Sequence, residues 1–249
     1  MSEAIIVFGK TARPGKVKTR FCPPLAPEEA AQLYDAFARD VMVTAKRYRD
    51  ERNERGADPS ERVVVWLAWD GAVDDPLAQF AREDMGFEWM EQRGSDLGSR
   101  LRNAVSNVRD MGAAPAIVVG TDSPSLMPEH LETARLLLRG NDVVFGPSFD
   151  GGYYLVGVDD VAAAKPLPEH VIFEEIAWSS AKVLEQSWSR AQRGGLLCDL
   201  MGFWYDIDTF EELKKRQFHL CDYLASRDPL VAQYTRELMA SKKFEFNSR

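Results

Sequence analysis

The sequence predicts a doubly wound α/β fold, in which helices cover both faces of a mostly parallel sheet. Short apolar runs typical of buried strands alternate along the chain with longer segments of helical periodicity. Glycine, acidic and basic residues directly follow several of these runs, as expected where ligands bind beyond the carboxyl ends of parallel strands. With 249 residues, 45% of them hydrophobic, the chain is long enough to bury a sizeable core.

The elements follow one another in the order that this fold requires. The predicted strands are Ile5–Phe8, Val63–Leu67, Ala116–Val119, Val143–Phe145 and Tyr153–Val158. The predicted helices are Pro27–Arg49, Leu97–Val108, Pro128–Leu138, Ala181–Ala191 and Phe210–Leu220. We expect one domain over residues 1–220 and a helical extension over residues 221–249. This extension would pack on the domain or on a partner subunit, as in a homodimer.

The composition argues against several classes of protein. A net charge of -8 and a pI near 5.1 disfavour general binding to nucleic acid or to anionic membranes. No apolar run approaches the roughly 20 residues of a membrane-spanning helix. The first residues lack a signal-sequence pattern, and the three cysteines are widely spaced. We therefore expect a cytoplasmic protein with reduced thiols.

A strongly basic loop follows the first predicted strand. Its charged residues are Lys10, Arg13, Lys16, Lys18 and Arg20. Like charges so close together repel one another, and a turn at Pro14 and Gly15 lets backbone N–H groups approach the same point. We predict a phosphate or pyrophosphate site in this loop, with a solvated basic loop as the plainer alternative. Gly9-Lys10-Thr11 is not the end of a P-loop, because the residues before it form a strand.

Acidic residues follow two other segments. Asp122 lies in the turn at the carboxyl end of the strand Ala116–Val119, where a hard divalent cation such as Mg²⁺ or Mn²⁺ could share it with substrate phosphates. Asp206 and Asp208 lie on one face of an extended segment and could form the other half of that metal site. The plainer alternative is that these carboxylates cap turns or helices.

The turn between the last two predicted strands carries an acid and paired glycines. Asp150 could orient an acceptor hydroxyl or act as a base. Gly151, Gly152 and Tyr153 could approach the same acceptor, since glycine permits close contact between backbone and ligand. Asp-Gly is also a strong hairpin signal, so a plain turn is the alternative interpretation.

Taken together, these motifs resemble the bacterial DUF2064 proteins, also called the transferase-1 family associated with radical-SAM and selenium-domain operons. The resemblance rests on V-F-G-K, P-G-K-V-K-T-R, T-D-S-P-S-L, G-P-S-F-D-G-G-Y-Y-L-V-G and D-I-D-T. It runs from about Ile5 to Leu213. It implies a fold of the GT-A superfamily of nucleotide-diphospho-sugar transferases, similar to 2-phospho-lactate guanylyltransferase, with the first loop around nucleotide phosphates.

The resemblance also implies roles for individual residues. Asp122 falls where the superfamily has its first metal-binding carboxylate, and Asp208 falls near the second, with Asp206 as a close competitor. The D-L-G segment contributes residues near the base. The resulting nucleotide-binding and phosphate-binding set is Lys10, Pro14, Gly15, Lys18, Thr19, Arg20, Asp96 and Gly98.

We expect a metal-dependent transferase that uses a nucleotide-diphospho-sugar donor and a small-molecule acceptor, with Lys18 and Asp150 as catalytic residues. One alternative is nucleotidyl transfer from a nucleoside triphosphate to a small phosphorylated acceptor, with release of pyrophosphate. Another is a nucleotide-binding partner protein without catalysis. The G-G-x-S-x-R loop of true nucleotidyltransferases is absent from the sequence, and the choice between glycosyl and nucleotidyl transfer stays open.

Overall fold

The structure, a computed structural model, describes residues 2–56, 62–159 and 166–242. Seven strands form one sheet in the order β3-β2-β1-β4-β6-β5-β7. They are β1 (Ser2–Lys10), β2 (Val63–Asp70), β3 (Glu88–Glu91), β4 (Ala113–Gly120), β5 (Val143–Pro147), β6 (Tyr153–Val158) and β7 (Cys198–Leu200). Only β6 runs antiparallel to its neighbours, β4 and β5, so the predicted mostly parallel sheet is confirmed.

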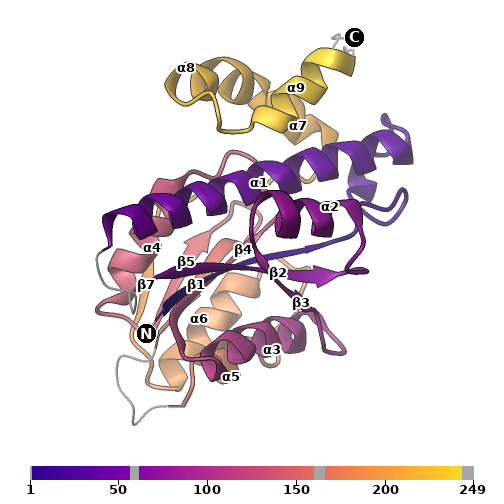
Figure 1. Cartoon of the computed structure of the whole chain (residues 1–249). Coiled ribbons are helices and arrows are strands. Elements are labelled where there is room, and N and C mark those ends of the chain that lie inside the picture. The colour runs from indigo at the N-terminus through magenta and orange to yellow at the C-terminus, as the bar shows by residue number, and fades with distance from the viewer. Residues whose placement is uncertain (1, 57–61, 160–165, 243–249) are drawn as a thin grey trace.

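Helices cover both faces of this sheet, as the doubly wound pattern predicts (Figure 1). One face carries α1 (Pro27–Arg55), α2 (Pro76–Gln79) and α4 (Pro128–Leu138). The other carries α3 (Leu97–Asp110), α5 (Glu169–Ile172) and α6 (Val183–Arg193). Alternating residues of β1 separate the two layers, because Ile5 and Val7 pack on the α1 side while Ala4 and Ile6 pack on the α3 side.

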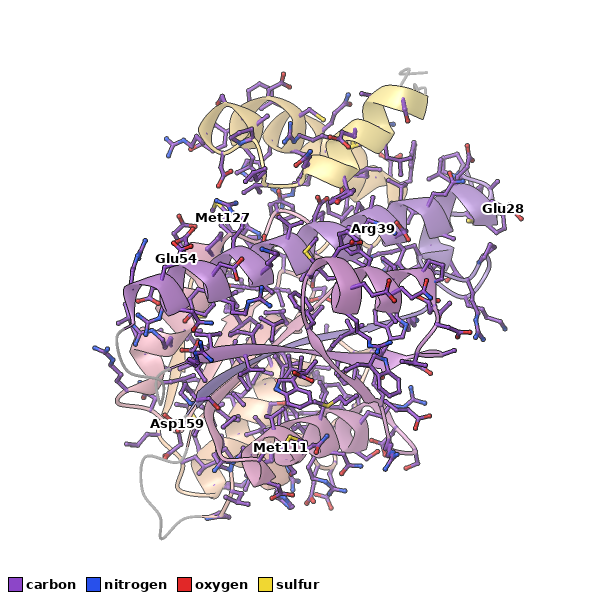
Figure 2. All side chains as sticks on the ribbon, viewed as in Figure 1. Glu28, Arg39, Glu54, Met111, Met127 and Asp159 are labelled. Atoms are coloured by element: carbon purple, nitrogen blue, oxygen red, sulfur yellow. The ribbon has the colours of Figure 1, made fainter. Side chains whose placement is uncertain are left out.

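The longest helix, α1, begins and ends for identifiable reasons. Pro27 occupies its first turn, where no backbone donor is needed, and the Glu29 carboxylate accepts a hydrogen bond from the Ala26 N–H at 2.8 Å. The helix extends to Arg55, six residues beyond the predicted end, and in this last part the Asn53 side chain exchanges hydrogen bonds with the Val63 backbone at 2.8 and 3.1 Å. Side chains fill the space between α1 and the sheet, whereas Glu28 and Glu54 are exposed at opposite ends of the helix (Figure 2).

The C-terminal helices pack on the outer side of α1 (Figure 1). They are α7 (Phe210–Phe218), α8 (Ala225–Arg227) and α9 (Gln233–Lys242), with a π-helical turn at His219–Leu224. The buried Asp40 carboxylate of α1 accepts hydrogen bonds from the backbone N–H groups of Tyr234 at 2.8 Å and Thr235 at 3.0 Å. The extension therefore lies on the domain itself, but it is broken into short helices. Its end, residues 243–249, lies outside the described residues, and the two-part division and the homodimer stay predictions.

Within the described residues, no helix has both the length and the apolar character that a membrane crossing requires.

One buried carboxyl group makes the stability of the fold dependent on pH. Glu3 at the start of β1 is 5% exposed, and the Tyr48 hydroxyl donates a hydrogen bond to its Oε1 at 2.6 Å. Burial raises the pKa of Glu3 to about 7, and the hydrogen bond offsets only part of that effect. The folded state therefore binds a proton that the unfolded state, with a glutamate pKa near 4.3, has already lost.

We predict that the ionisation of Glu3 alone lowers the free energy of unfolding by on the order of 2–3 kcal/mol as the pH rises from about 5 to about 8. The matched variant Glu3→Gln keeps a hydrogen-bond acceptor but cannot ionise, so it should lack this part of the pH dependence. Urea unfolding of both proteins across this range measures the difference. Parallel pH profiles would show that Glu3 ionises normally in the folded protein.

Candidate functional site

The candidate site lies where the strand order reverses beside β1. The chain leaves β1 for β2 on one side and returns through β4 on the other, which opens a crevice at the carboxyl ends of β1 and β4. The buried hydroxyl of Tyr34 joins the two strand ends. It accepts hydrogen bonds from the Lys10 N–H at 3.0 Å and from the Thr121 hydroxyl at 2.9 Å. The basic loop and the Asp122 turn are thereby held on opposite sides of this crevice.

Lys18 lies at the centre of the crevice and joins three separate segments. Its Nζ is 2.6 Å from Asp122 Oδ1 and 2.8 Å from Asp208 Oδ1, and it donates a hydrogen bond to the Ile207 carbonyl at 2.7 Å. The Lys18 side chain is 4% exposed. Burial alone would lower the pKa of its ammonium, but the two carboxylates outweigh burial and raise it above the usual value. Lys18 is therefore charged at neutral pH.

Asp122 and Asp208 converge on one cation, which is the geometry that the predicted metal site needs. The described residues contain no group of three or more histidine, cysteine or acidic side chains that could hold a metal ion. Two carboxylates still fit a magnesium-type ion, because Mg²⁺ commonly takes its remaining ligands from water and substrate phosphates. Asp206 lies near this pair, but within the described residues it forms no ion pair with Lys18. Burial raises its pKa to about 7, the charges of the pair also raise it, and its Oδ1 accepts a hydrogen bond from Ser123 at 2.5 Å.

A cleft of about 590 Å³ lies on the β1 side of Lys18 and is named the donor cleft below. Its charged lining residues are Lys10, Lys16, Lys18, Arg20, Asp70, Arg100, Asp122 and Asp208. Arg100 is paired with Asp70 at 2.8 Å. In the described part of the chain, Lys10, Lys16 and Arg20 have no acidic partner within ion-pair distance. The basic loop thus lines a cleft with cations that are unpaired in the described chain, and Thr19 also lines it.

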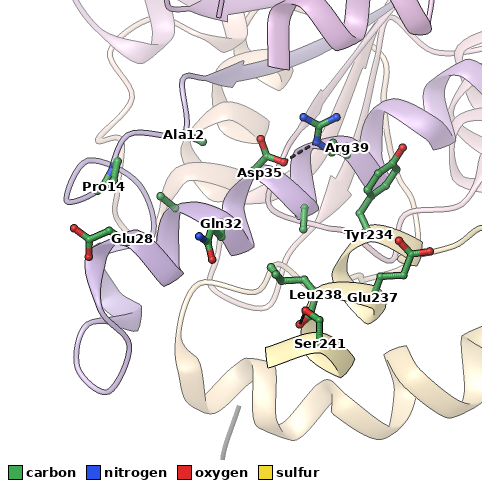
Figure 3. A pocket seen from close by; sticks show the side chains of 12 residues that line it. Ala12, Pro14, Glu28, Gln32, Asp35, Arg39, Tyr234, Glu237, Leu238 and Ser241 are labelled. Carbon is green, nitrogen blue, oxygen red and sulfur yellow. Dashed lines mark hydrogen bonds and ion pairs between the residues drawn. The ribbon is translucent and has the colours of Figure 1, made fainter. Parts of the chain in front are cut away.

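The Pro-Gly turn of the basic loop lies away from this cleft. Pro14 lines a different pocket of about 690 Å³, between the loop, α1 and α9 (Figure 3). In that pocket Arg39 is already paired with Asp35 at 2.6 Å. Gly15 has a positive φ of 70° and open space around it, so it shapes the turn. Neither residue lines the donor cleft, in contrast to the predicted phosphate-binding set.

A second cavity of about 860 Å³ adjoins the donor cleft and is named the acceptor cavity below. Asp150, Gly152 and Tyr153 line it, and their binding of an acceptor stays a prediction. The Asp150 Oδ1 accepts hydrogen bonds from Ser148 Oγ at 2.5 Å and from the Gly152 N–H at 2.9 Å, so the plain turn interpretation is also correct. Gly151 does not line the cavity. An added Cβ there would lie 2.2 Å from the Ala181 carbonyl oxygen, so it permits a close packing contact.

Tyr153 offers its ring rather than its hydroxyl to the acceptor cavity. The ring lies 5.4 Å from that of Phe145 and 6.5 Å from that of Trp178, measured between centroids. The hydroxyl is buried beside Ser187 of α6, and this burial raises the pKa of Tyr153. Tyr153 can therefore make an apolar contact with a molecule in this cavity, whereas Ser148 and Asp150 of the neighbouring turn line it with polar groups.

The D-L-G segment does not place its acid or its glycine in either cavity. Asp96 caps α3, because its Oδ1 accepts a hydrogen bond from the Ser99 N–H at 2.8 Å, and that bond lowers the pKa of Asp96. An added Cβ at Gly98 would lie 2.2 Å from the Phe173 carbonyl oxygen. The intervening Leu97 lines both cavities instead. The structure thus assigns capping and packing to the two residues that were predicted to lie near the base.

Several residues that line the two cavities were not predicted from the sequence. Gln92, which follows the short strand β3, donates from Nε2 to the carbonyls of Gly9 at 2.7 Å and Ala68 at 3.0 Å. Trp178 and Ser179 come from the connection between α5 and α6. A four-residue strand and an irregular loop give weak periodic signals, so only the rule that strand ends carry ligands could have indicated Gln92.

Comparison with known proteins identifies the family. Residues 56–180 match the sequence profile of the family described as "Uncharacterized protein conserved in bacteria (DUF2064)". The chain belongs to the DUF2064 family. The match includes Asp122 and Asp150, whereas Lys18 and Asp208 lie outside the matched residues. The suspected resemblance is therefore correct. Lys18, Asp122 and Asp208, which are named the clamp below, come from segments inside and outside the match.

The DUF2064 chain also has the fold of nucleotide-diphospho-sugar transferases. A candidate nucleotide-diphospho-sugar transferase from Desulfovibrio desulfuricans G20 shares 28% identity over 94% of this chain and 99% of that protein, with a TM-score of 0.71. The fold is also similar to that of 4-diphosphocytidyl-2C-methyl-D-erythritol synthase from Anaerococcus prevotii DSM 20548. That protein is 12% identical over 88% of this chain and 98% of its own, with a TM-score of 0.51.

A curated relative shows a more distant similarity. The 2-phospho-L-lactate guanylyltransferase of Methanocaldococcus jannaschii is 21% identical over 140 residues, which are 56% of this chain and 53% of the relative. The chain thus spans about half the length of that relative.

The packing role of Gly98 makes a testable prediction for this DUF2064 protein. Gly98→Ala should destabilise the chain by about 1–3 kcal/mol, because the new methyl group overlaps the Phe173 backbone and the Trp178 ring. Gly140→Ala is the matched control, since an added Cβ there meets no atom within 4 Å. Thermal and urea unfolding measure both effects. Equal stability of the two variants would contradict the packing role.

Proposed function

We propose that this DUF2064 protein is a metal-dependent transferase that binds the phosphates of a nucleotide donor in the donor cleft. The observation that carries the proposal is the set of unpaired cations facing a pair of convergent carboxylates. Lys10, Lys16 and Arg20 line the cleft without acidic partners in the described chain. In an acidic protein such cations serve an anionic ligand, because a concentrated positive charge attracts it and lowers its energy when bound.

The residues of the clamp divide into two roles. Asp122 and Asp208 would hold one Mg²⁺ or Mn²⁺, which when bound supplies positive charge to the donor phosphates. Lys18 would then exchange its carboxylate contacts for a phosphate oxygen, since a divalent ion between the same two carboxylates competes with its ammonium. Lys18 and Arg20 would stabilise negative charge on the leaving group as its bond breaks.

The first candidate reaction is glycosyl transfer from a nucleotide-diphospho-sugar. An acceptor hydroxyl would attack the anomeric carbon, the bond from that carbon to the diphosphate would break, and the nucleoside diphosphate would leave. Asp150 could take the hydroxyl proton, because its carboxylate lies in the wall of the acceptor cavity. The name of the structural relative from Desulfovibrio desulfuricans G20 supports this candidate.

The charge of the donor cleft favours a second candidate when a metal is bound. Apart from the Arg100–Asp70 pair, four cations face two carboxylates, an excess of two positive charges. A nucleotide sugar carries about two negative charges and a nucleoside triphosphate about four. A bound divalent cation therefore brings the net charge of the cleft into balance with that of a triphosphate.

In nucleotidyl transfer, an acceptor phosphate oxygen would attack the α-phosphorus and pyrophosphate would leave. The name of the curated guanylyltransferase supports this candidate.

Product analysis separates the candidates. The full chain would first be screened by thermal shift against nucleoside triphosphates and nucleotide sugars, with and without Mg²⁺ or Mn²⁺. Each stabilising nucleotide would then be incubated with a panel of small sugars and phosphorylated acids. Release of nucleoside diphosphate supports glycosyl transfer, and release of pyrophosphate supports nucleotidyl transfer. Binding without turnover supports a nucleotide-binding partner protein, and no binding contradicts the proposal.

Two substitutions test the clamp directly. Lys18→Ala should slow turnover by about 100-fold, the usual loss when one preorganised positive group is removed. Asp122→Asn should abolish turnover or its dependence on the divalent cation. The matched control is Lys46→Ala, which removes an exposed ion pair with Asp50 on α1, away from the cleft. Unchanged kinetics in Lys18→Ala would remove this residue from the phosphate site.

A further inference from the structure

The loop between α5 and α6 contributes a residue to the junction of the two cavities. Six residues line both cavities: Phe8, Arg20, Leu97, Asp122, Ser179 and Asp208. Three of the polar four belong to the basic loop and the clamp. Ser179 is the fourth polar residue. It belongs to the connection between α5 and α6, which has no part in the proposed function above. A group that moves from donor to acceptor must pass this junction.

Ser179 adopts a backbone conformation that side-chain-bearing residues rarely take. Its φ is 63°, and in the described chain only Lys18, Glu175 and Ala232 are other non-glycine residues with positive φ. Two of these four, Lys18 and Ser179, line the donor cleft. Such conformations are energetically unfavourable and persist where the surrounding structure enforces them, most often at functional sites.

Packing on both sides of Ser179 fixes this conformation. The Ala181 backbone lies against Gly151, where an added Cβ would be only 2.2 Å from the Ala181 oxygen. The Leu184 N–H donates a hydrogen bond to the Gly151 carbonyl at 3.0 Å. On the other side, the Trp178 ring packs against the Tyr153 ring. The loop is therefore attached to the turn that carries Asp150, and Ser179 is held between two anchored neighbours.

The Ser179 hydroxyl is available to a ligand. Ser179 is exposed at the junction, and its hydroxyl makes no hydrogen bond to any described residue. The hydroxyl of the next residue differs, because Ser180 donates to the Ala177 carbonyl at 2.6 Å. Ser180 therefore stabilises the loop, whereas Ser179 presents an unused donor beside Arg20 and the clamp carboxylates.

We propose that Ser179 binds substrate, with its hydroxyl donating a hydrogen bond to the donor phosphate that lies at the junction of the two cavities. This inference rests on the proposed function. The cations of the basic loop lie on one side of that phosphate, and Ser179 supplies a neutral donor from the wall formed by the α5–α6 connection. A neutral donor suits this place, because it satisfies a phosphate oxygen without adding a charge that would compete for Asp122 and Asp208.

Two substitutions at this position separate the hydroxyl from the backbone. Ser179→Ala removes the hydroxyl and keeps a residue that resists positive φ, whereas Ser179→Gly removes the hydroxyl and relaxes the backbone. Ala232→Gly is the matched control, because it relaxes a positive φ of 53° in the connection to α9 and touches neither cavity. Isothermal titration with inorganic pyrophosphate and Mg²⁺ gives the affinity of each folded protein.

Both Ser179 variants should bind magnesium pyrophosphate about tenfold more weakly than the wild type, as expected for the loss of one hydrogen bond to a charged group. Ala232→Gly should bind normally, and Ser179→Gly should raise the melting temperature, because Ser179 is exposed and its substitution leaves the core unchanged. Wild-type affinity in both Ser179 variants would overturn this inference alone. If the wild-type protein does not bind pyrophosphate with Mg²⁺, both the inference and the phosphate role of the donor cleft are contradicted.

Discussion

The buried ammonium of Lys18 is the interaction on which the candidate site depends. It neutralises Asp122 and Asp208, which approach from the end of β4 and from the segment before α7. Without a cation between them, these two carboxylates would repel each other across a partly buried space. The charge of Lys18 therefore lets the fold bring both acids together before any ligand binds. In the proposed function, a divalent cation would take the place of this ammonium between the two carboxylates.

The topology of the sheet explains why the cations and acids meet at this place. The reversal of strand order beside β1 opens the crevice, and Tyr34 fixes the ends of β1 and β4 on its two sides. The antiparallel strand β6 then carries the Asp150 turn to the same edge, beside β4. Donor cleft and acceptor cavity are thus neighbours because their strands are neighbours. The charge excess lies on the donor side, and the aromatic ring of Tyr153 lies on the acceptor side.

The sequence predicts five of the seven strands, the long helix and the acidic and basic residues of the site because their signals are local, whereas the short strands β3 and β7 were not predicted. Apolar periodicity marks α1, and the position of Asp122 directly after a buried strand places it at the ligand-binding edge. Other predictions depended on the direction of the backbone in loops and at a helix start, which hydrophobic periodicity does not reveal. Pro14 lines a different pocket from the one expected. Asp96 caps the start of α3, and the next residue, Leu97, lines the cavities instead. Ser179 was missed because its loop has no periodic pattern.

The most direct test of this account is a crystal structure of the full chain with Mn²⁺ and pyrophosphate, in which anomalous scattering locates the metal. The account predicts Mn²⁺ between Asp122 and Asp208, with the Lys18 ammonium moved onto a phosphate oxygen in the donor cleft. Lys18 still between the two carboxylates, with the metal or the pyrophosphate bound elsewhere, would contradict it.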